Sequence, residues 1–350
     1  MTIEWTFFLS ELMQNPILLV VTLLNIGVII VNGATDAPNA IATAVSTRAM
    51  KPRHAIIMAA VFNFLGLLLV SLVSTAVAHT IFSMVDFGGN SHQALTALMA
   101  AMVAIIVWGA AAWWFGIPTS QSHSLIAGLT GAAIAVQGGL DAINGAEWMK
   151  VVYGILPSTL LGFGLGWINY KVIGRMCRNV DRLKANSFFK WAQICSGAGV
   201  AFMHGAQDGQ KFMSIAMLGI ALSFGSSTPD AGGFPMWVMI TCSLAISAGT
   251  VVGGKRIIKS VGMDMVKLEK YQGVAANFST VFTLLFASLT GMPVSTGHCN
   301  TSAIMGVGAS RSIKRVNWSI AKNMLLAWVI TFPACGLIGF VLAKLFMMLA

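Results

Sequence analysis

The sequence predicts an all-α polytopic membrane protein made of two inverted-topology repeats with discontinuous helices and two re-entrant helical hairpins. The first observation is composition: 57% of the 350 residues are hydrophobic and 9% are charged, which leaves too little polar material to cover a soluble globule. The second is the recurrence of apolar runs of about 20 residues, the length needed to cross a bilayer. The third is that two polar motifs of the first half return in the second half.

The basic residues predict the topology. Four clusters hold 17 of the 21 lysine and arginine residues, namely 48–53, 171–190, 255–270 and 311–315. The polar loops between them are acidic and carry Asp86, Asp141, Glu147 and Asp230. By the positive-inside rule the clusters are cytoplasmic and the acidic loops external. The net charge of +10 therefore reflects topology, and no nucleic-acid partner is expected.

With this orientation the apolar runs can be followed along the chain. Both termini are expected to be external, and the same order of crossings occurs twice with opposite direction. The expected crossings and hairpins are 15–50, 55–84, 93–137 and 146–170, followed by 191–224, 234–253, 270–310 and 318–348.

Sequence similarity between the halves supports the same division. "NGATDAPNA" at 32–40 matches "HGAQDGQKF" at 204–212, and "GIPTSQSHSLIAG" at 116–128 matches "GMPVSTGHCNTSA" at 291–303. The offsets of 172 and 175 residues are nearly constant, which indicates a duplicated unit. We expect a first repeat at 1–172, a basic cytoplasmic linker at 173–190 and a second repeat at 191–350. Inverted repeats with interrupted helices are typical of secondary transporters.

The second pair of motifs predicts an anion site. In each hairpin a Gly-Pro turn precedes hydroxyl residues, and Pro118 and Pro293 are each expected to begin a second half-helix, because proline is favoured in the first helical turn. Free N–H groups, the helix dipole and hydroxyl donors would together surround a small tetrahedral oxyanion. The candidate ligands in the hairpins are Thr119, Ser120, Gln121, Ser122, Ser295 and Thr296.

The first pair of motifs places charges inside the membrane. A charged side chain deep in a bilayer costs at least about 2.5 kcal/mol on insertion scales, so Asp36, Asp208 and Lys211 are candidate functional residues. Asp208 and Lys211 are three residues apart and could instead neutralise each other in a purely structural pair. Asp36 has no cation near it in the sequence before Arg48.

These motifs also carry a resemblance to a known family. "NGATDAPNAIATAVSTRAM", "HGAQDGQKFM", "PTSQSH" and "PVSTGH" resemble the signatures of Pit-type inorganic phosphate transporters, and "TRAMKPRHAIIMAAVFNFLG" at 47–66 is especially similar to the bacterial low-affinity branch. The resemblance implies phosphate symport driven by sodium or protons, a homodimer and a location in the bacterial cytoplasmic (inner) membrane. A second motif ending in Gln-Lys is similar to the branch taken to be proton-coupled and to carry neutral divalent metal phosphate, with Mg²⁺, Ca²⁺ or Zn²⁺.

The chain departs from the family pattern at two places. The usual Asn-Asp pair is Thr35-Asp36 in the first repeat and Gln207-Asp208 in the second, and Lys211 stands where the first repeat has Asn39. Phosphate beside two carboxylates is repelled unless a cation or proton is bound, so coupling is a physical requirement. Lys211 would supply a fixed positive charge to the anion. The candidate ligands of the coupling ion are Asn32, Thr35, Asp36, Asn39, Gln207 and Asp208.

Three histidines are candidates for a proton relay. His123 and His298 follow hydroxyl residues and could titrate near neutral pH, or could be bonded to backbone carbonyls. His204 opens the second acidic motif and could serve in packing instead.

Other classes of function are weighed against this prediction. An intramembrane hydrolase would need Ser122 or Ser295 with a histidine, but neighbouring residues on one helix point in different directions, so no enzyme is expected. A channel is disfavoured by paired discontinuous helices. Within transporters, sodium coupling and sulfate transport stay open, although hydrogen phosphate, unlike sulfate, can donate a hydrogen bond to a carboxylate. The five cysteines show no CxxC spacing, and no cofactor is expected.

Overall fold

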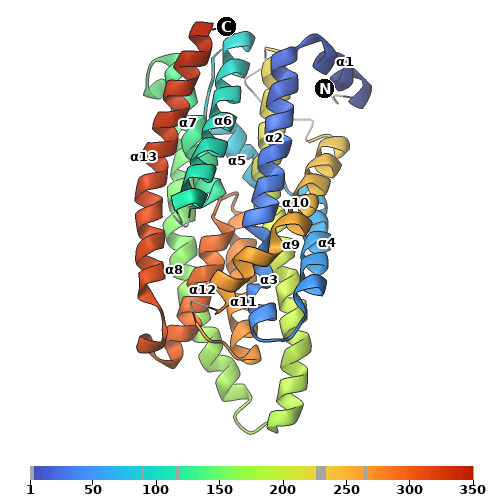
Figure 1. Ribbon diagram of the computed structural model, residues 1–350, viewed down its shortest axis with the longest axis vertical. Coiled ribbons are helices and arrows are strands. Elements are labelled where there is room, and N and C mark those ends of the chain that lie inside the picture. Colours follow the sequence, from blue (N-terminus) through green and yellow to red (C-terminus); the bar gives the residue numbers. More distant parts are fainter. Residues whose placement is uncertain (1–3, 89, 116–118, 226–233, 264–265, 350) are drawn as a thin grey trace.

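The structure, a computed structural model, is a bundle of α-helices, and it describes residues 4–88, 90–115, 119–225, 234–263 and 266–349. The two chain ends lie at the same end of the bundle, and the connection between α8 and α9 lies at the opposite end (Figure 1). The predicted helical class is confirmed for the described residues.

The helices follow the expected crossings closely. The first half contains α1 (Trp5–Gln14), α2 (Pro16–Thr35), α3 (Ala37–Ser46), α4 (Pro52–Val73), α5 (Ala76–Ser83), α6 (Ser91–Phe115), α7 (Gln121–Gln137) and α8 (Gly145–Met176). The second half contains α9 (Arg182–Ser223), α10 (Met236–Met263), α11 (Lys270–Leu289), α12 (Thr296–Arg311) and α13 (Trp318–Leu349). Two short 3₁₀ turns, Leu140–Ala142 and Ile313–Arg315, precede α8 and α13. Most of the predicted linker at 173–190 is helical, so the connection itself is 177–181.

Several helices are long and apolar enough to span a bilayer. Among the described residues there are seven such segments, at Pro16–Ser46, Pro52–Val73, Ser91–Ala112, Gly145–Met176, Met236–Gly253, Lys270–Leu289 and Ala321–Leu349. The 42-residue α9 is not one of them, because its buried face carries polar and charged residues. The protein is therefore a multi-pass membrane protein, as predicted.

The first crossing is interrupted at Asp36. Its N–H bonds the carbonyl of Asn32 at 2.8 Å and ends α2, and α3 begins at once with Pro38 in its first turn. Proline has no N–H to continue the ladder, so a break here is expected. In the second half, Gln210 matches Pro38 and Asp208 matches Asp36. α9 runs unbroken through both positions. The helix of the first motif is thus discontinuous, whereas the second motif lies within a continuous helix, because Gln210 keeps the donor that Pro38 lacks.

Two helical hairpins occupy opposite halves of the bundle. α6 and α7 pack together in one half, and α11 and α12 pack together in the other (Figure 1). α7 has 17 residues and α12 has 16, so each is about 25 Å long, shorter than the hydrocarbon core of roughly 30 Å. Pro118 lies outside the described residues. Pro293 precedes α12 and does not open it, because Ser295 is the N-cap and accepts a bond from the His298 N–H at 3.4 Å.

Helix crossings occur in matched pairs. A Cβ on Gly33 would collide with the Ile246 carbonyl oxygen, and one on Gly205, 172 residues later, would collide with that of Asn63. α10 packs on α2, and α4 packs on α9. Only glycine lets two backbones approach so closely. Close contacts at equivalent glycines therefore recur in the second half with the packed helices exchanged.

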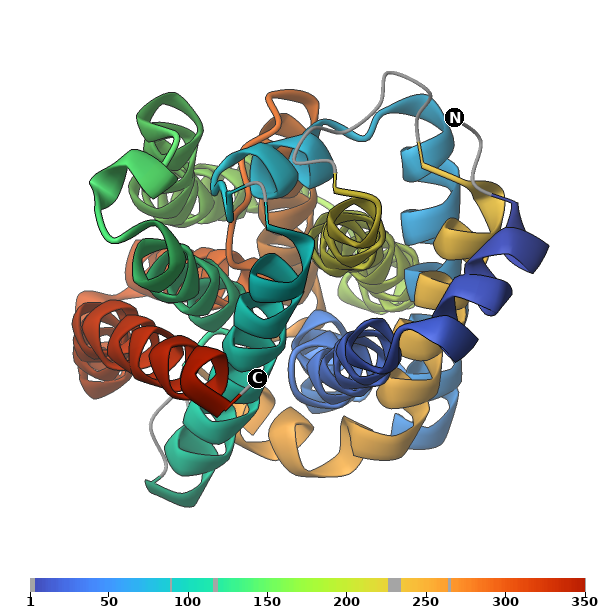
Figure 2. The same ribbon diagram turned by 90° about the horizontal axis from the view of Figure 1, so that it is seen from above.

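The hairpins repeat this arrangement. A Cβ on Gly131 would collide with the Gly336 carbonyl oxygen, and one on Gly306, 175 residues later, would collide with that of Phe163. α7 therefore packs on α13, and α12 packs on α8. Seen from above, α7, α8, α12 and α13 lie together on one side of the bundle (Figure 2). The tips of α7 and α12 and the break at Asp36 are thereby directed to a common region.

Candidate functional site

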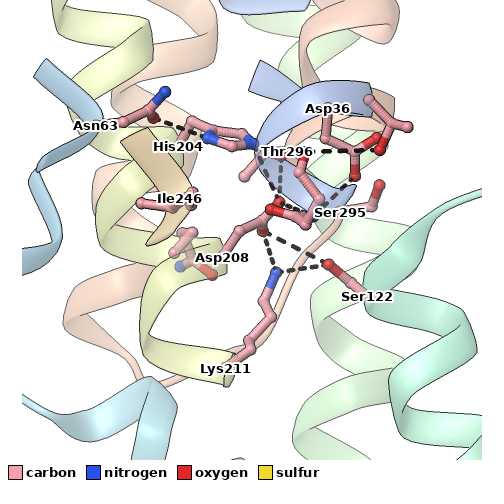
Figure 3. A network of polar contacts seen from close by, with 12 residues as sticks. Asp36, Asn63, Ser122, His204, Asp208, Lys211, Ile246, Ser295 and Thr296 are labelled. Atoms are coloured by element: carbon pink, nitrogen blue, oxygen red, sulfur yellow. Dashed lines mark hydrogen bonds and ion pairs between the residues drawn. The ribbon is translucent and has the colours of Figure 1, made fainter. Parts of the chain in front are cut away.

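A buried ion pair forms the centre of the site. Asp208 and Lys211 are both 0% exposed, and Lys211 Nζ lies 2.6 Å from Asp208 Oδ1 (Figure 3). The same ammonium group donates to Ser122 Oγ at 2.9 Å and to the backbone carbonyl of Val294. A buried charge is tolerated only when it is paired and hydrogen-bonded, and these contacts meet that condition.

The other oxygen of Asp208 joins the two halves of the chain. Thr296 Oγ1, at the start of α12, donates to Asp208 Oδ2 at 3.0 Å. Asn32 Nδ2, in the last turn of α2, lies 3.4 Å from the same oxygen, and His204 Nε2 lies 3.3 Å from it. The carboxylate therefore contacts the first acidic motif and the second hairpin together.

Asp36 lies beside this cluster at the break between α2 and α3. Asn32 Nδ2 also lies 3.3 Å from Asp36 Oδ2, so one amide bridges the two acids. The carboxyl group of Asp36 interacts electrostatically with Asp208 and Lys211 and with the backbone N–H of Gln121 at the start of α7. Unlike Asp208, the residue Asp36 is only partly buried. The two acids predicted from sequence are thus brought together, as expected from the repeat.

Some of the hairpin residues reach the cluster and others do not. Ser122 and Thr296 contact Asp208 directly. Ser120 is 4% exposed, and its Oγ has no hydrogen-bond partner among the described residues. Thr119 accepts a bond from Trp108 and bonds Thr331 on α13, so its hydroxyl is engaged away from the acids.

Two predicted ligands of a coupling ion are used elsewhere. The Thr35 hydroxyl donates to the Val31 carbonyl of its own helix at 2.9 Å. Gln207 Nε2 donates to Ser288 Oγ at 3.0 Å, and its Oε1 accepts from the Val294 N–H at 3.5 Å. Gln207 therefore holds the segment before α12. These side chains point away because helical spacing, and not proximity in sequence, decides which face a residue occupies.

Asn39 is placed by the second hairpin. Its backbone carbonyl accepts a bond from Asn300 Nδ2 at 2.7 Å, and its side-chain Nδ2 lies 3.2 Å from the position of a Cβ on Gly297. Its Oδ1 has no hydrogen-bond partner among the described residues. The lone pairs of this amide oxygen are therefore available to a ligand in the turn that follows Asp36.

The three histidines are all near the site. His204 Nδ1 bonds Asn63 Oδ1 at 2.8 Å while its Nε2 faces Asp208, so the ring links α4 to the acid. The rings of His123 and His298 have centroids 5.2 Å apart. These two residues are equivalent in the repeat, and their approach brings the two hairpins into contact.

Sequence reasoning missed several polar residues that support the site. Asn63 orients His204, Ser288 binds Gln207, and Asn300 connects Asn39 to Thr280. All are polar residues within apolar helices, a pattern that marks a candidate position but does not identify its partner.

A second buried polar group lies nearer the α8–α9 end. Thr43 Oγ1 donates to Asn277 Oδ1 at 2.8 Å and accepts from Gln193 Nε2 at 2.9 Å. Asn277 Nδ2 donates to Ser196 Oγ at 3.1 Å. Next to this group is a cavity of about 810 Å³, lined by residues that include 46–48, 185–186, 189 and 268–271. This polar group thus lies between the acids and the cavity at the α8–α9 end.

The arrangement can bind an ion rather than catalyse a covalent reaction. Two carboxylates and one ammonium leave one net negative charge, which opposes the approach of an anion unless further cations or protons bind. Among the residues that the structure describes, no three His, Cys, Asp or Glu side chains are grouped as a metal site would require.

Comparison with known proteins decides the family. The model of the phosphate transporter family matches residues 32–187 and 176–339. The chain belongs to this family. A Bacillus subtilis protein described as "Probable low-affinity inorganic phosphate transporter" is 38% identical over 309 residues, covering 88% of this chain and 91% of that protein. A Rhizobium meliloti protein with the same description is 38% identical over 311 residues, covering 88% and 90%.

The fold is shared with a solved structure. A sodium-dependent phosphate transporter superimposes with a TM-score of 0.86 and 23% identity, covering 96% of this chain and all of that one. Membership in a family of transporters confirms the expectation that the chain is not an enzyme.

Proposed function

We propose that this member of the phosphate transporter family is a secondary symporter that imports inorganic phosphate together with protons by alternating access. The observation that carries the proposal is the pair of acids, Asp36 and the buried Asp208, which the Asn32 amide bridges beside the starts of α7 and α12, with the Lys211 ammonium group paired to Asp208. An anion can approach such a site only when its negative charge is offset. Binding of phosphate and of the coupling charge are therefore linked.

The hairpin tips supply the donors for phosphate. Ser122 and Thr296 already point at Asp208, and Ser120 and Ser295 lie at the N-caps of α7 and α12, where backbone N–H groups and the helix dipoles favour an anion. Phosphate could enter as a neutral complex with Mg²⁺, Ca²⁺ or Zn²⁺, which reduces the repulsion by the acids. Hydrogen phosphate is preferred to sulfate because its own O–H can donate to a carboxylate.

The membrane arrangement is also part of the proposal. The matched glycine crossings support two repeats, 1–172 and 191–350, joined through 173–190. With the basic clusters on the cytoplasmic side, both chain ends are external, consistent with their position at one end of the bundle. The protein is placed in the bacterial cytoplasmic membrane as a homodimer.

The coupling ion is tested by imposing gradients on proteoliposomes. The vesicle interior is set to pH 8 and the exterior to pH 6, both on the order of one unit from neutrality. We expect labelled phosphate to accumulate inside. Protonation of Asp36 from the acidic side reduces the negative charge that opposes the anion. Addition of a protonophore should stop accumulation, and Mg²⁺ should stimulate it.

An inward sodium gradient without a pH gradient is the matched comparison. Accumulation that requires sodium and is indifferent to pH would establish the sodium-coupled alternative. Labelled sulfate, tested in the same vesicles, should accumulate much less than phosphate.

The hairpin serines are tested by binding. Loss of a donor to a buried anion costs on the order of 1.5 to 3 kcal/mol, or roughly 10- to 150-fold in affinity. We therefore expect Ser120→Ala and Ser295→Ala each to weaken phosphate binding by that factor, measured by titration in detergent at fixed pH and metal concentration. Because both side chains would share one ligand, the effects of the two substitutions on the free energy of phosphate binding should be non-additive in the double variant.

Two serines on the same helices provide controls. Ser124 Oγ donates to the Ser120 carbonyl, and Ser302 Oγ donates to that of Thr159, so their hydroxyls are already satisfied by backbone. Ser124→Ala and Ser302→Ala should bind phosphate as the parent does. Unchanged affinity in both test variants would place the anion elsewhere, around Lys211.

A further inference from the structure

The Lys211 ammonium group is surrounded as a bound metal cation would be. Its oxygen ligands are a carboxylate on α9, a hydroxyl on α7 and a backbone carbonyl before α12, from Asp208, Ser122 and Val294. Hard cations take these same oxygen types in proteins. The ligands come from three separate elements, and the ammonium is 0% exposed. It therefore occupies a closed oxygen cage and not a loose surface pair.

The first half has the corresponding cage without a lysine. Lys211 is equivalent to Asn39 at an offset of 172, and Ser122 is equivalent to Gly297 at an offset of 175. Lys211 Nζ contacts Ser122, and the Asn39 amide approaches Gly297 within 3.2 Å of a Cβ position. The two side chains thus reach symmetry-related places from symmetry-related helices.

What the first half lacks is a positive charge. Asp36 is there, and Asn32 and Asn39 each present a buried side-chain Oδ1 that has no hydrogen-bond partner among the described residues. Asn32 itself is 0% exposed. Unpaired buried acceptors next to a carboxylate are costly unless a cation or proton donor binds them. The first-half site is therefore open to an exchangeable positive charge.

Charge balance gives the same result. Asp36 and Asp208 contribute two negative charges, and Lys211 cancels one of them. A single additional positive charge makes the site neutral before phosphate arrives. Before phosphate binds, two mobile cations together with Lys211 would place three positive charges around the two acids, at a repulsive cost in a buried site.

We propose that the Lys211 ammonium group is a tethered cation that permanently fills the cation site of the second half, so that one exchangeable positive charge, held at Asp36, couples each transport cycle. The consequence for transport rests on the proposed function. The occupancy of the second-half site does not, because it can be measured without phosphate.

Binding of ²²Na⁺ to purified protein in detergent, without phosphate, tests the occupancy. Lys211→Asn copies the residue of the first half and removes the tethered charge while providing an oxygen ligand. We expect this variant to gain saturable sodium binding at least about tenfold tighter than that of the parent. The gain should disappear in Lys211→Asn/Asp208→Asn, and Lys211→Met, which offers no oxygen, should show none.

The controls separate this proposal from the proposed function. Lys150→Asn removes an ammonium group that is 44% exposed and should leave sodium binding unchanged. Lys211→Gln replaces the test variant if Lys211→Asn does not yield monodisperse protein. The proposal would be overturned if folded Lys211→Asn and Lys211→Gln gained no sodium binding. It would also be overturned if the parent protein bound two sodium ions per chain saturably. Failure of the parent to accumulate phosphate would instead refute the proposed symport and leave the occupancy result standing.

Discussion

Asp36→Asn is expected to abolish concentrative phosphate uptake while leaving a folded protein. The amide cannot take up and release a positive charge, so phosphate movement loses its connection to the proton gradient. Accumulation in proteoliposomes should fall to the equilibrium level, whereas exchange of labelled for unlabelled phosphate across the membrane continues. The substitution leaves no buried charge without a partner, because Asp36 is contacted by the Asn32 amide and is only partly buried.

A matched acid outside the site controls for the loss of charge. Asp141 is exposed in the turn before α8, and Asp141→Asn should accumulate phosphate as the parent does. Concentrative uptake by Asp36→Asn at the parent level would show that this carboxylate does not hold the coupling charge.

Asp208→Asn is expected to lower the stability of the protein more than Asp36→Asn does. It leaves the fully buried Lys211 ammonium without its carboxylate, and breaking a buried pair in this way costs about 3 to 5 kcal/mol. We expect a clear loss of unfolding free energy in a denaturant titration in detergent. Lys211→Met should be comparably destabilised, because the carboxylate then stays buried alone.

The double variant Asp208→Asn/Lys211→Met tests the coupling between the two residues. Replacement of both partners removes the unpaired charge, so the double variant should be more stable than the sum of the single losses predicts. Glu147 and Lys150 form a pair with the same spacing but with side chains 20% and 44% exposed. Glu147→Gln should change stability by less than about 1 kcal/mol. Equal effects for the two pairs would mean that Lys211 is solvated.

Sequence reasoning could predict the order of the helices and the meeting of the two acidic motifs. Apolar runs fix the crossings, and the constant offset between motifs requires that Asp36 and Asp208 occupy equivalent places. It could not predict which side chains turn inward, because a helix break changes the rotation of the residues around it. Thr35 precedes the break at Asp36 and bonds its own helix, whereas Asn32, one turn earlier, contacts both acids.

The continuity of α9 could not be inferred from the similarity of the two motifs either. The motif "HGAQDGQKF" is similar to "NGATDAPNA", but a helix break depends on whether the backbone N–H is present. Gln210 keeps it, and α9 is continuous. Partners supplied by other helices, such as Asn63 for His204 and Ser288 for Gln207, depend on packing that no local pattern encodes.

The polar group of Thr43, Gln193 and Asn277 has a consequence for how water reaches the acids. The repeat equivalents of these three residues are Ile215, Val21 and Met102, all apolar and buried. Hydroxyl and amide groups can replace the hydrogen bonds that water loses in a narrow passage, whereas an apolar constriction is prone to dewetting. We therefore expect water to reach Asp36 and Asp208 more readily from the α8–α9 end, where the 810 Å³ cavity lies, than from the end that carries the chain termini.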